Sequence, residues 1–522
     1  MITKRAIACL AVAALACFAV PAAAEPGHHS TQDVVQTDHG AVRGVVADEY
    51  RLFQGIPYAA PPVGDLRWQP PRPAAPWRGV LDATQPRSQC AQLAVLGVPE
   101  THGEDCLYLN VTTPRRTHGK APVMVWFHGG FFTSGSGAIY DGRRLAVTGD
   151  VIVVTVNFRL GPLGFLALPA LSQEHPGIQS GNYGIEDQQA ALRWVRGNAA
   201  RFGGDPGNVT IFGESSGSAS VCLHLASPTA AGLFDRAIGE SGSCSNNQLT
   251  KQAAESNGSN LAARFGCTDP GTAAACLRAV PAGDLLHAWT GGGPAIGGLE
   301  FPRQPVDALR QNRFHHVPLL LGNNRDEERF GTSLQFDATG HPLTADQYGQ
   351  LLAATYGPHA DEVLQRYPLT GYPTPSIALA TIRTDHGGPL STCDNLTAYR
   401  LAERRVPVYA YQFADRTAPP LVDIPNFDEG AEHGTELNYL FPNVFGRPLT
   451  ETQLQLADTM ARYWTSFARN GNPNGSSNGR QTPHWPRFHD ARDVLSLDLG
   501  PGGIRPTDVG RASNCDFWAA LS

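Results

Sequence analysis

Short apolar runs rich in β-branched residues recur at wide intervals along the 522-residue chain. Between them lie stretches in which apolar residues return with helical spacing, as at 185–200 and 454–468. Continuous apolar strands that alternate with helices predict a mostly parallel sheet covered on both faces, an α/β fold. In such a sheet the functional residues lie in loops beyond the carboxyl ends of the strands. The five clearest strand candidates are 123–127, 151–156, 209–212, 317–321 and 406–413.

The first residues have the pattern of a secretory signal peptide. Lys4 and Arg5 precede an apolar run at 6–20, and small alanine residues follow it. This order predicts a cleaved leader at 1–24 and a secreted or periplasmic protein. The run is too short to be a convincing membrane span. A lipid anchor on Cys17 is disfavoured, because the position three residues earlier is not a branched apolar one.

The rest of the chain, 25–522, has the composition of a folded protein. It shows no linker and no internal repeat, so we expect one large domain, and no stretch in it approaches eighteen apolar residues. The whole sequence is 42% hydrophobic and 17% charged, which excludes global disorder. Its net charge of −7 provides no basic surface for nucleic acid or anionic membranes.

Eight of the ten cysteines follow the leader. An even number in an exported protein indicates disulfides. Cys222 falls within a predicted helix, and for it we expect a buried free thiol; the state of Cys244 stays open. Two pairs close in sequence could form short loops, and a third could tie down the C-terminus: Cys90 with Cys106, Cys267 with Cys276, and Cys393 with Cys515.

A G-x-S-x-G pattern at 213–217 is the first candidate for chemistry. It directly follows a predicted strand at 208–212 and precedes a plausible helix at 216–225. Strand, sharp turn and helix form the geometry of a nucleophile elbow, which exposes the hydroxyl of Ser215 above the sheet. The alternative is that Ser215 is only a turn or helix-capping serine.

A second turn follows the predicted strand 123–127. His128-Gly129-Gly130 could point backbone N–H groups at a tetrahedral intermediate, together with the N–H of Ser216. Taken alone, the turn is more simply a flexible glycine turn, and His128 is better interpreted as a structural histidine.

A serine nucleophile needs a base, and the base needs an orienting carboxylate. After the predicted strands 317–321 and 406–413 come three adjacent acids at 326–328 and a loop that contains His433. Spacing alone does not choose among the acids, or select His433 from seventeen histidines. His433 and Glu436 could be mistaken for a metal pair, but no third ligand has suitable spacing.

Several further motifs make the sequence resemble the type-B carboxylesterase and cholinesterase-like family of the α/β hydrolases. The matches run along nearly the whole mature chain in the family's order. They are FQGIPYA at 53–59, EDCLYLN at 104–110, Asn182-Tyr183-Gly184 with Asp187-Gln188, FGGDP at 202–206, Ser241-Gly242, Asp326-Glu327, the block around His433, and GNPN at 471–474.

The resemblance implies an α/β-hydrolase fold and a serine ester hydrolase that needs no metal or organic cofactor. It implies Ser215 as nucleophile, His433 as base and then acid, and Glu327 as the acid that orients the histidine. It places oxyanion donors at the backbone N–H groups of Gly130, Phe131 and Ser216, and further polar groups near the serine at Glu214 and Ser241. It also implies the disulfides Cys90–Cys106, Cys267–Cys276 and, less strongly, Cys393–Cys515.

Some positions depart from the family pattern. Phe131 stands where many relatives have a third glycine, and Glu328 stands where a glycine often follows the acid. Residues 91–105 contain no aromatic side chain that could hold a quaternary ammonium group, which disfavours choline esters. The segment 289–301 is expected near the acyl pocket.

The expected substrate is a small-molecule or polymer ester. Three alternatives remain at this stage: a lipase, a hydrolase of amides, carbamates or polymer esters that uses the same residues, and a non-catalytic adhesion module. The natural ester and the oligomeric state are not given by the sequence.

Overall fold

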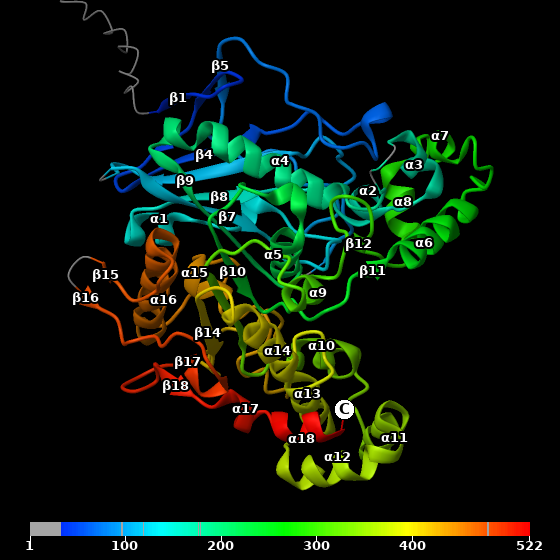
Figure 1. Ribbon diagram of the computed structural model, residues 1–522, viewed down its shortest axis with the longest axis vertical. Coiled ribbons are helices and arrows are strands. Elements are labelled where there is room, and N and C mark those ends of the chain that lie inside the picture. The colour runs from blue at the N-terminus through cyan, green and yellow to red at the C-terminus, as the bar shows by residue number, and fades with distance from the viewer. Residues whose placement is uncertain are drawn as a thin grey trace, which may run out of the picture.

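The computed structural model describes residues 33–521, except for 96–97, 118, 176, 178 and 478–479. The leader expected at 1–24 lies outside these residues. A large sheet of eleven strands forms the centre of the molecule (Figure 1). In spatial order its strands are β18 (Arg505–Thr507), β17 (Val494–Leu497), β14 (Val408–Phe413), β13 (Leu319–Asn324), β10 (Arg236–Glu240), β9 (Gly204–Glu214), β7 (Ala121–Phe127), β8 (Ile152–Val156), β6 (Tyr108–Pro114), β4 (Tyr50–Pro57) and β3 (Val45–Val46).

The seven strands from β17 to β8 run parallel to one another, whereas β18 pairs antiparallel with β17 at one side and β6, β4 and β3 follow β8 in antiparallel pairings at the other. All five strands expected from the sequence are present, as β7, β8, β9, β13 and β14. The two expected helices are also present, as α4 (Tyr183–Asn198) and α16 (Glu451–Asn470). The prediction of a mostly parallel α/β sheet is therefore confirmed.

Alternation along the strands divides the core into two hydrophobic layers. In β7, Val123 and Val125 face one layer, whereas Met124 and Trp126 face the other. The first layer is covered by α4, α5 (Ser216–Ala226), α9 (Pro305–Arg310) and α14 (Thr392–Glu403). The second layer is covered by α1 (Arg143–Gly149), α15 (Leu437–Leu440) and α16.

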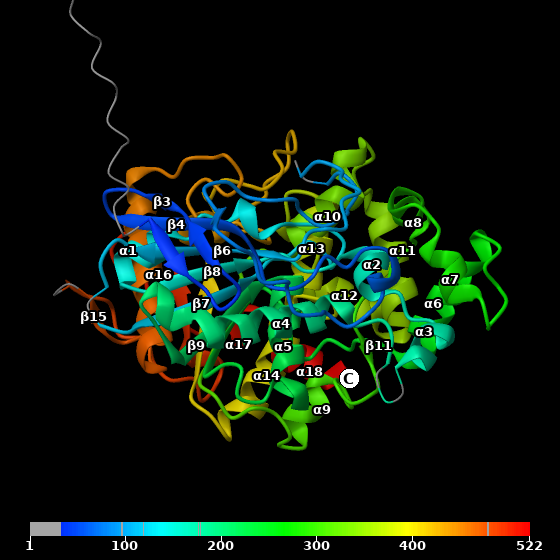
Figure 2. The ribbon, with the colours of Figure 1, turned by 90° about the horizontal axis from the view of Figure 1, so that it is seen from above.

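Two groups of helices extend from this core. One of them, with its own apolar cluster, lies together at one end of the molecule in both Figure 1 and Figure 2: α2 (Gly161–Phe165), α3 (Pro169–Glu174), α6 (Lys251–Arg264), α7 (Ala273–Arg278) and α8 (Ala282–Ala288). The other packs at the bottom of Figure 1: α10 (Glu328–Gln335), α11 (Ala345–Tyr356), α12 (Ala360–Arg366), α13 (Pro375–Asp385) and α18 (Cys515–Leu521), with α17 (Val509–Ala512) before it.

Three small sheets complete the secondary structure of the described residues. They are β1 (Val34–Gln36) with β2 (Ala41–Arg43) and β5 (Val80–Asp82), then β11 (Leu249–Thr250) with β12 (Ala295–Ile296), and β15 (Ser476–Ser477) with β16 (Arg480–Gln481).

The structure contains the three disulfides expected from the resemblance, Cys90–Cys106, Cys267–Cys276 and Cys393–Cys515. The expectation of a free thiol at Cys222 was wrong, because Cys222 forms a fourth disulfide with Cys244. Cys222 lies on the buried face of α5, and the chain leaving β10 passes close to it, with 5.2 Å between the two Cα atoms. The predicted helix indicated that the thiol of Cys222 is buried. It did not indicate which loop packs against that thiol.

Candidate active site

Ser215 lies at the sharp turn between β9 and α5. Its φ of 58° is in the left-handed region, where a non-glycine residue is uncommon and is held by its surroundings. One such constraint is the backbone N–H of Ser215, which donates to the carbonyl of Glu240 at 2.9 Å. Glycine is required at 217, because a Cβ there would lie 2.0 Å from the carbonyl oxygen of Phe127. The G-x-S-x-G segment therefore has the strand–turn–helix geometry expected from its sequence.

The turn after β7 packs directly against this serine. A Cβ built on Gly129 would lie 3.1 Å from Cβ of Ser215, so the two loops approach as closely as backbone allows. Gly130 and Phe131 both have positive φ, at 107° and 58°. Within the described residues, no group of the protein accepts a hydrogen bond from the N–H of Gly130, Phe131 or Ser216. Three backbone donors thus remain available beside the hydroxyl.

His433 lies in the long loop between β14 and α15, and its side chain is almost fully buried. Its Nδ1 is 2.8 Å from Oε2 of Glu327, which is completely buried just after β13. The other oxygen of Glu327 accepts the N–H of Asn324 at 2.6 Å. Both carboxylate oxygens are therefore engaged, and the imidazole is held in one orientation.

The two acids on either side of Glu327 have different partners. Asp326 binds the guanidinium of Arg416 through both oxygens, at 2.8 and 2.5 Å, and so fixes a neighbouring loop. Glu328 begins α10, and its pKa is raised by burial and then by the charge of Glu327. Of the three adjacent acids, Glu327 is the one hydrogen-bonded to His433.

The second nitrogen of His433, Nε2, lies 3.1 Å from Oε1 of Glu214, the residue that precedes the serine. Among the described residues, the hydroxyl of Ser215 is not hydrogen-bonded to this ring. Burial raises the pKa of Glu214. Burial lowers the pKa of His433, but the carboxylates of Glu214 and Glu327 outweigh that effect and raise it.

Ser241 directly follows β10, and among the described residues its hydroxyl forms no hydrogen bond with that of Ser215. Its own hydroxyl donates to Oε1 of Glu436 at 3.2 Å, and the side chain of Asn324 donates to the other oxygen of Glu436. Glu436 is completely buried, and burial raises its pKa to about 7. Sequence reasoning considered Glu436 only as a false metal ligand, and missed that it supports the loop which carries His433.

A cavity of about 400 Å³ opens above these groups. Ser215, His433 and Glu214 lie in its wall, and most of the remaining wall is apolar. The segment 289–301, expected near the acyl pocket, contributes no residue to this wall. The apolar part comes from the loop closed by the first disulfide, from the segment after β7, from α10, and from the chain before and after α15: Val95, Val98, Pro99, Phe131, Ile139, Phe330, Leu421, Leu437, Val444 and Phe445.

His128 is completely buried, stacks on Phe158 and points Nδ1 at the carbonyl of Gly129. Its burial lowers its pKa to about 4, which keeps it neutral and structural. In the part of the chain that the structure describes, no three His, Cys, Asp or Glu side chains form a group that could hold a metal ion. None of the helices described is both long and apolar enough to cross a membrane.

Gln92 is a further residue that sequence reasoning missed. It is completely buried in the loop closed by Cys90–Cys106 and joins this loop to the turn after β7. Its amide donates to the carbonyl of Gly135 at 3.0 Å and accepts from the N–H of Gly135 at 2.7 Å. A lone glutamine in a loop carries no sequence signal for such a role.

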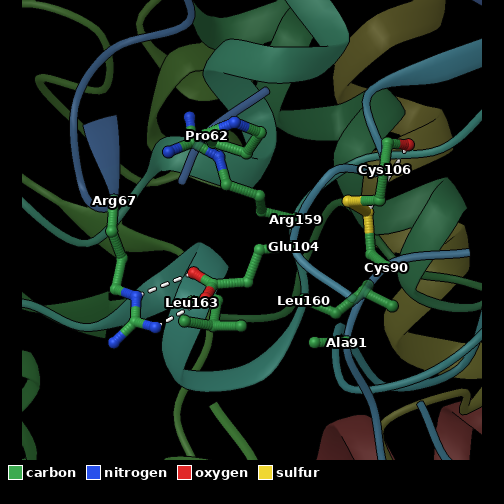
Figure 3. A pocket seen from close by; sticks show the side chains of 9 residues that line it. All are labelled: Pro62, Arg67, Cys90, Ala91, Glu104, Cys106, Arg159, Leu160 and Leu163. Carbon is green, nitrogen blue, oxygen red and sulfur yellow. Dashed lines mark hydrogen bonds and ion pairs between the residues drawn. A yellow bond between two sulfur atoms is a disulfide. The ribbon is translucent and has the colours of Figure 1, made fainter. Parts of the chain in front are cut away.

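The base of the same loop is held by an ion pair beside the disulfide (Figure 3). Arg67 binds both carboxylate oxygens of Glu104, at 2.7 and 2.5 Å. Arg67 also donates to the carbonyls of Arg278 and Val280, which connects the loop to the helices at the end of the molecule. The loop that walls the cavity is therefore fixed at its base.

Comparisons with known proteins show the family of this chain. The model of the carboxylesterase family matches residues 31–518. The chain is 34% identical to the fumonisin B1 esterase of Sphingopyxis macrogoltabida, with 94% of this chain and 92% of that protein aligned. It is 34% identical to the para-nitrobenzyl esterase of Bacillus subtilis (strain 168), with 90% and 95% aligned, and 33% identical to liver carboxylesterase 1 of Oryctolagus cuniculus, with 93% of each aligned.

Solved esterase structures also resemble this chain over most of its length. A PNB esterase structure superposes with a TM-score of 0.76 at 33% identity, covering 93% of this chain and 100% of that one. A thermophilic PNB esterase gives a TM-score of 0.77 at 32% identity. The chain therefore belongs to the carboxylesterase family, and it is a carboxylic ester hydrolase with the α/β-hydrolase fold.

Proposed function

We propose that ester cleavage proceeds through Ser215, His433 and Glu327 and through an acyl-enzyme intermediate. The observation that carries this proposal is the hydrogen bond of 2.8 Å between His433 and the buried Glu327, in the wall of the cavity that also contains Ser215. The bond fixes the tautomer that leaves Nε2 free of its proton. In free enzymes the bond between nucleophile and base is often formed only once the substrate is bound.

In the proposed reaction, the hydroxyl of Ser215 attacks the ester carbonyl while Nε2 of His433 takes its proton. The N–H groups of Gly130, Phe131 and Ser216 bind the oxyanion, and each such donor is worth on the order of 10²–10³ in rate. His433 then gives the proton to the departing alcohol. Water, deprotonated by the same nitrogen, attacks the acyl-enzyme and releases the acid together with free Ser215.

The test is the Ser215→Ala variant assayed with p-nitrophenyl butyrate. We expect turnover to fall to a small fraction of that of the unchanged enzyme, while the cavity and the fold are retained. Ser259→Ala is the matched control, since that serine is exposed on α6 and does not line the cavity. Full turnover in Ser215→Ala refutes the assignment. A covalent adduct of an organophosphate with Ser215, located by mass spectrometry, supports it independently.

A lipase is the second candidate, and one observation favours it. The apolar side chains Leu93, Val95 and Phe131 are exposed near the cavity, and Phe131 is 63% accessible. Such a patch is typical of a surface that meets another apolar phase. Activity on tributyrin below and above its solubility limit separates the two: a lipase shows a jump at the limit, and an esterase saturates before it.

We also propose that residues 1–24 are removed on export and that 25–522 form one catalytic domain. The four disulfides are consistent with an oxidising compartment. Sequencing the N-terminus of the mature protein tests the first point, and a single cooperative unfolding transition followed by two probes tests the second.

A further inference from the structure

Gln92 is linked to the active site through the turn that carries two of the proposed oxyanion donors. Its side chain is completely buried and does not line the cavity. The amide oxygen accepts the N–H of Gly135 at 2.7 Å, and the amide nitrogen donates to the carbonyls of Gly135 and Cys90 at 3.0 and 2.9 Å. Both amide hydrogens are therefore used, and the opposite orientation of the amide would place two donors against each other.

The backbone of Gln92 is fixed independently of this amide. Its N–H donates to the carbonyl of Thr101 at 2.9 Å, and its carbonyl accepts the N–H of Thr101 at 3.0 Å. Two residues earlier, Cys90 is joined by its disulfide to Cys106, which lies just before β6 of the central sheet (Figure 3). Gln92 is thus held close to the sheet, and its amide offers Gly135 a donor and an acceptor at fixed positions.

The turn from Gly129 to Gly135 is closed on itself, so a displacement at one end reaches the other. The carbonyl of Gly130 accepts the backbone N–H groups of Thr133 and Ser134 at 2.9 and 3.0 Å. A Cβ built on Gly130 would lie 2.2 Å from the carbonyl oxygen of Ser134. A Cβ built on Gly135 would lie 2.8 Å from the carbonyl oxygen of Gly129. The two ends of the turn are therefore in contact, without room for a methyl group between them.

The first residue of the same turn packs against the nucleophile. A Cβ built on Gly129 would lie 3.1 Å from Cβ of Ser215. The turn is thus held at Gly129 by the nucleophile elbow and at Gly135 by Gln92. The N–H groups of Gly130 and Phe131 lie along the chain between these two contacts.

We propose that Gln92 is a positioning residue for ester hydrolysis, which holds the N–H groups of Gly130 and Phe131 where the oxyanion forms. The proposal rests on the function proposed for Ser215 and for these donors. Donors stabilise an oxyanion well only if they are fixed before the reaction, within about 3 Å of the place where the charge develops. Because the substrate itself carries no oxyanion, displaced donors slow the chemical steps and leave the binding of substrate nearly unchanged.

The test is Gln92→Met, which keeps the length of the side chain and removes both hydrogen bonds to Gly135. We expect kcat for p-nitrophenyl butyrate to fall by a factor on the order of 10–100 with KM nearly unchanged. A displacement of about 1 Å costs up to about 10² in rate, and the loss of a whole donor costs about 10²–10³.

A second variant covers the case in which Gln92→Met does not fold. Gln92→Asn retains the amide but shortens the side chain by one carbon, so the amide no longer reaches Gly135. We expect kcat to fall by a similar factor in Gln92→Asn. Unchanged kcat in the variants that fold overturns the proposal.

Gln453→Met is the matched control. Gln453 is also buried, and its amide donates to the carbonyl of Thr417 at 3.0 Å and accepts the N–H of Thr450 at 2.9 Å. None of these three residues lines the cavity. The substitution should lower the thermal midpoint, as Gln92→Met does, and leave kcat unchanged. An equal fall of kcat in the two variants would mean that lost stability is the cause, and overturns the proposal.

A trifluoromethyl ketone separates the positioning of donors from a general loosening of the site. The hydroxyl oxygen of Ser215 forms a bond to the ketone carbon, its proton passes to His433, and the carbonyl oxygen becomes an oxyanion that faces the same N–H groups. We expect the inhibition constant of the ketone to rise in Gln92→Met by the factor by which kcat/KM falls. The corresponding secondary alcohol forms no oxyanion, and its inhibition constant should stay the same. An unchanged inhibition constant of the ketone refutes the role of Gln92.

These outcomes separate the proposal from the function on which it rests. If the function proposed for Ser215 fails, Ser215→Ala retains turnover and the ketone forms no adduct with the unchanged enzyme. If only the role of Gln92 fails, Ser215→Ala is inactive, while the unchanged enzyme and Gln92→Met bind the ketone equally well.

Discussion

Glu214 gives the sharpest test of how the site controls its own base. Its Oε1 lies 3.1 Å from Nε2 of His433, and a negative charge there stabilises the protonated imidazole. Only the neutral imidazole can accept the proton of Ser215, so activity rises as pH rises through the pKa of His433. Replacing Glu214 by Gln removes the charge, lowers that pKa and moves the rising limb of the pH profile to lower pH.

The distance sets the size of this shift. At 3.1 Å, Coulomb's law gives about 5 kcal/mol for an effective dielectric constant of about 20, and about 1.3 kcal/mol for bulk water. One pKa unit corresponds to about 1.36 kcal/mol, so the two energies correspond to shifts in the pKa of His433 of about 4 and about 1 units. Because both side chains are almost fully buried, we expect a value above the bulk-water limit, between the two.

The assay is kcat/KM for p-nitrophenyl butyrate from about pH 5 to about pH 11, corrected for spontaneous hydrolysis, because the carboxylates of Glu214 and Glu327 raise the pKa of His433 to about 10 and kcat/KM reports the pKa of groups in the free enzyme. Glu300→Gln is the control, since Glu300 is a buried acid outside the cavity wall, and its pKa is likewise raised by burial. Its rising limb should coincide with that of the unchanged enzyme. A limb that stays in place in Glu214→Gln, or moves to higher pH, refutes this account of His433.

Three further substitutions test other parts of the structure. Glu327→Gln should lower kcat by a factor on the order of 10³–10⁴ with little effect on KM, because it removes the charge that orients His433. Stopped-flow turnover measures kcat in the variant. A loss of kcat below tenfold contradicts this role of Glu327. Replacing Cys222 and Cys244 together by alanine opens a loop of 22 residues and should lower the free energy of unfolding, measured in urea, by about 3 kcal/mol. An unchanged urea midpoint would mean that the disulfide adds no stability. Gly217→Ala should destabilise the fold by about 1 to 3 kcal/mol or prevent folding, because the new methyl group meets a backbone carbonyl at 2.0 Å; a normal thermal midpoint argues against that contact.

The sequence predicted those parts of the fold in which one strong signal dominates. The buried parallel strands β7 and β8 are almost entirely apolar, with Thr155 as the one polar residue in them, and such runs have few other stable environments. β10 was missed because it contains a single β-branched residue, Ile238, and has charged residues, Arg236 and Glu240, at its two ends. Its place between β9 and β13 comes from pairing with its neighbours, which no local pattern encodes.

For the site, the residue pattern predicted which residues are candidates but not the directions in which their side chains point. The order of Ser215, the three acids and His433 was visible in the sequence, but their spacing did not choose among the acids. Family resemblance pointed to Glu327, and the structure gives a physical reason for that choice. The turn after β13 points Glu327 towards His433, while Asp326 is bound by Arg416 from another loop. The decisive difference is thus a partner that lies 90 residues away in the sequence.

The same argument explains why the buried acids around His433 were not recognised as one group. Glu214, Glu240, Glu327 and Glu436 come from four separate segments, and burial contributes to a raised pKa for three of them. Four carboxyl groups in one buried region cannot all be ionised at little cost, since each charge raises the energy of the others. Burial and mutual repulsion therefore favour protonation of some of these acids, and Glu214 and His433 are the two groups of the region that line the cavity. The raised pKa values thus follow from the assembly of the four segments and from no single motif.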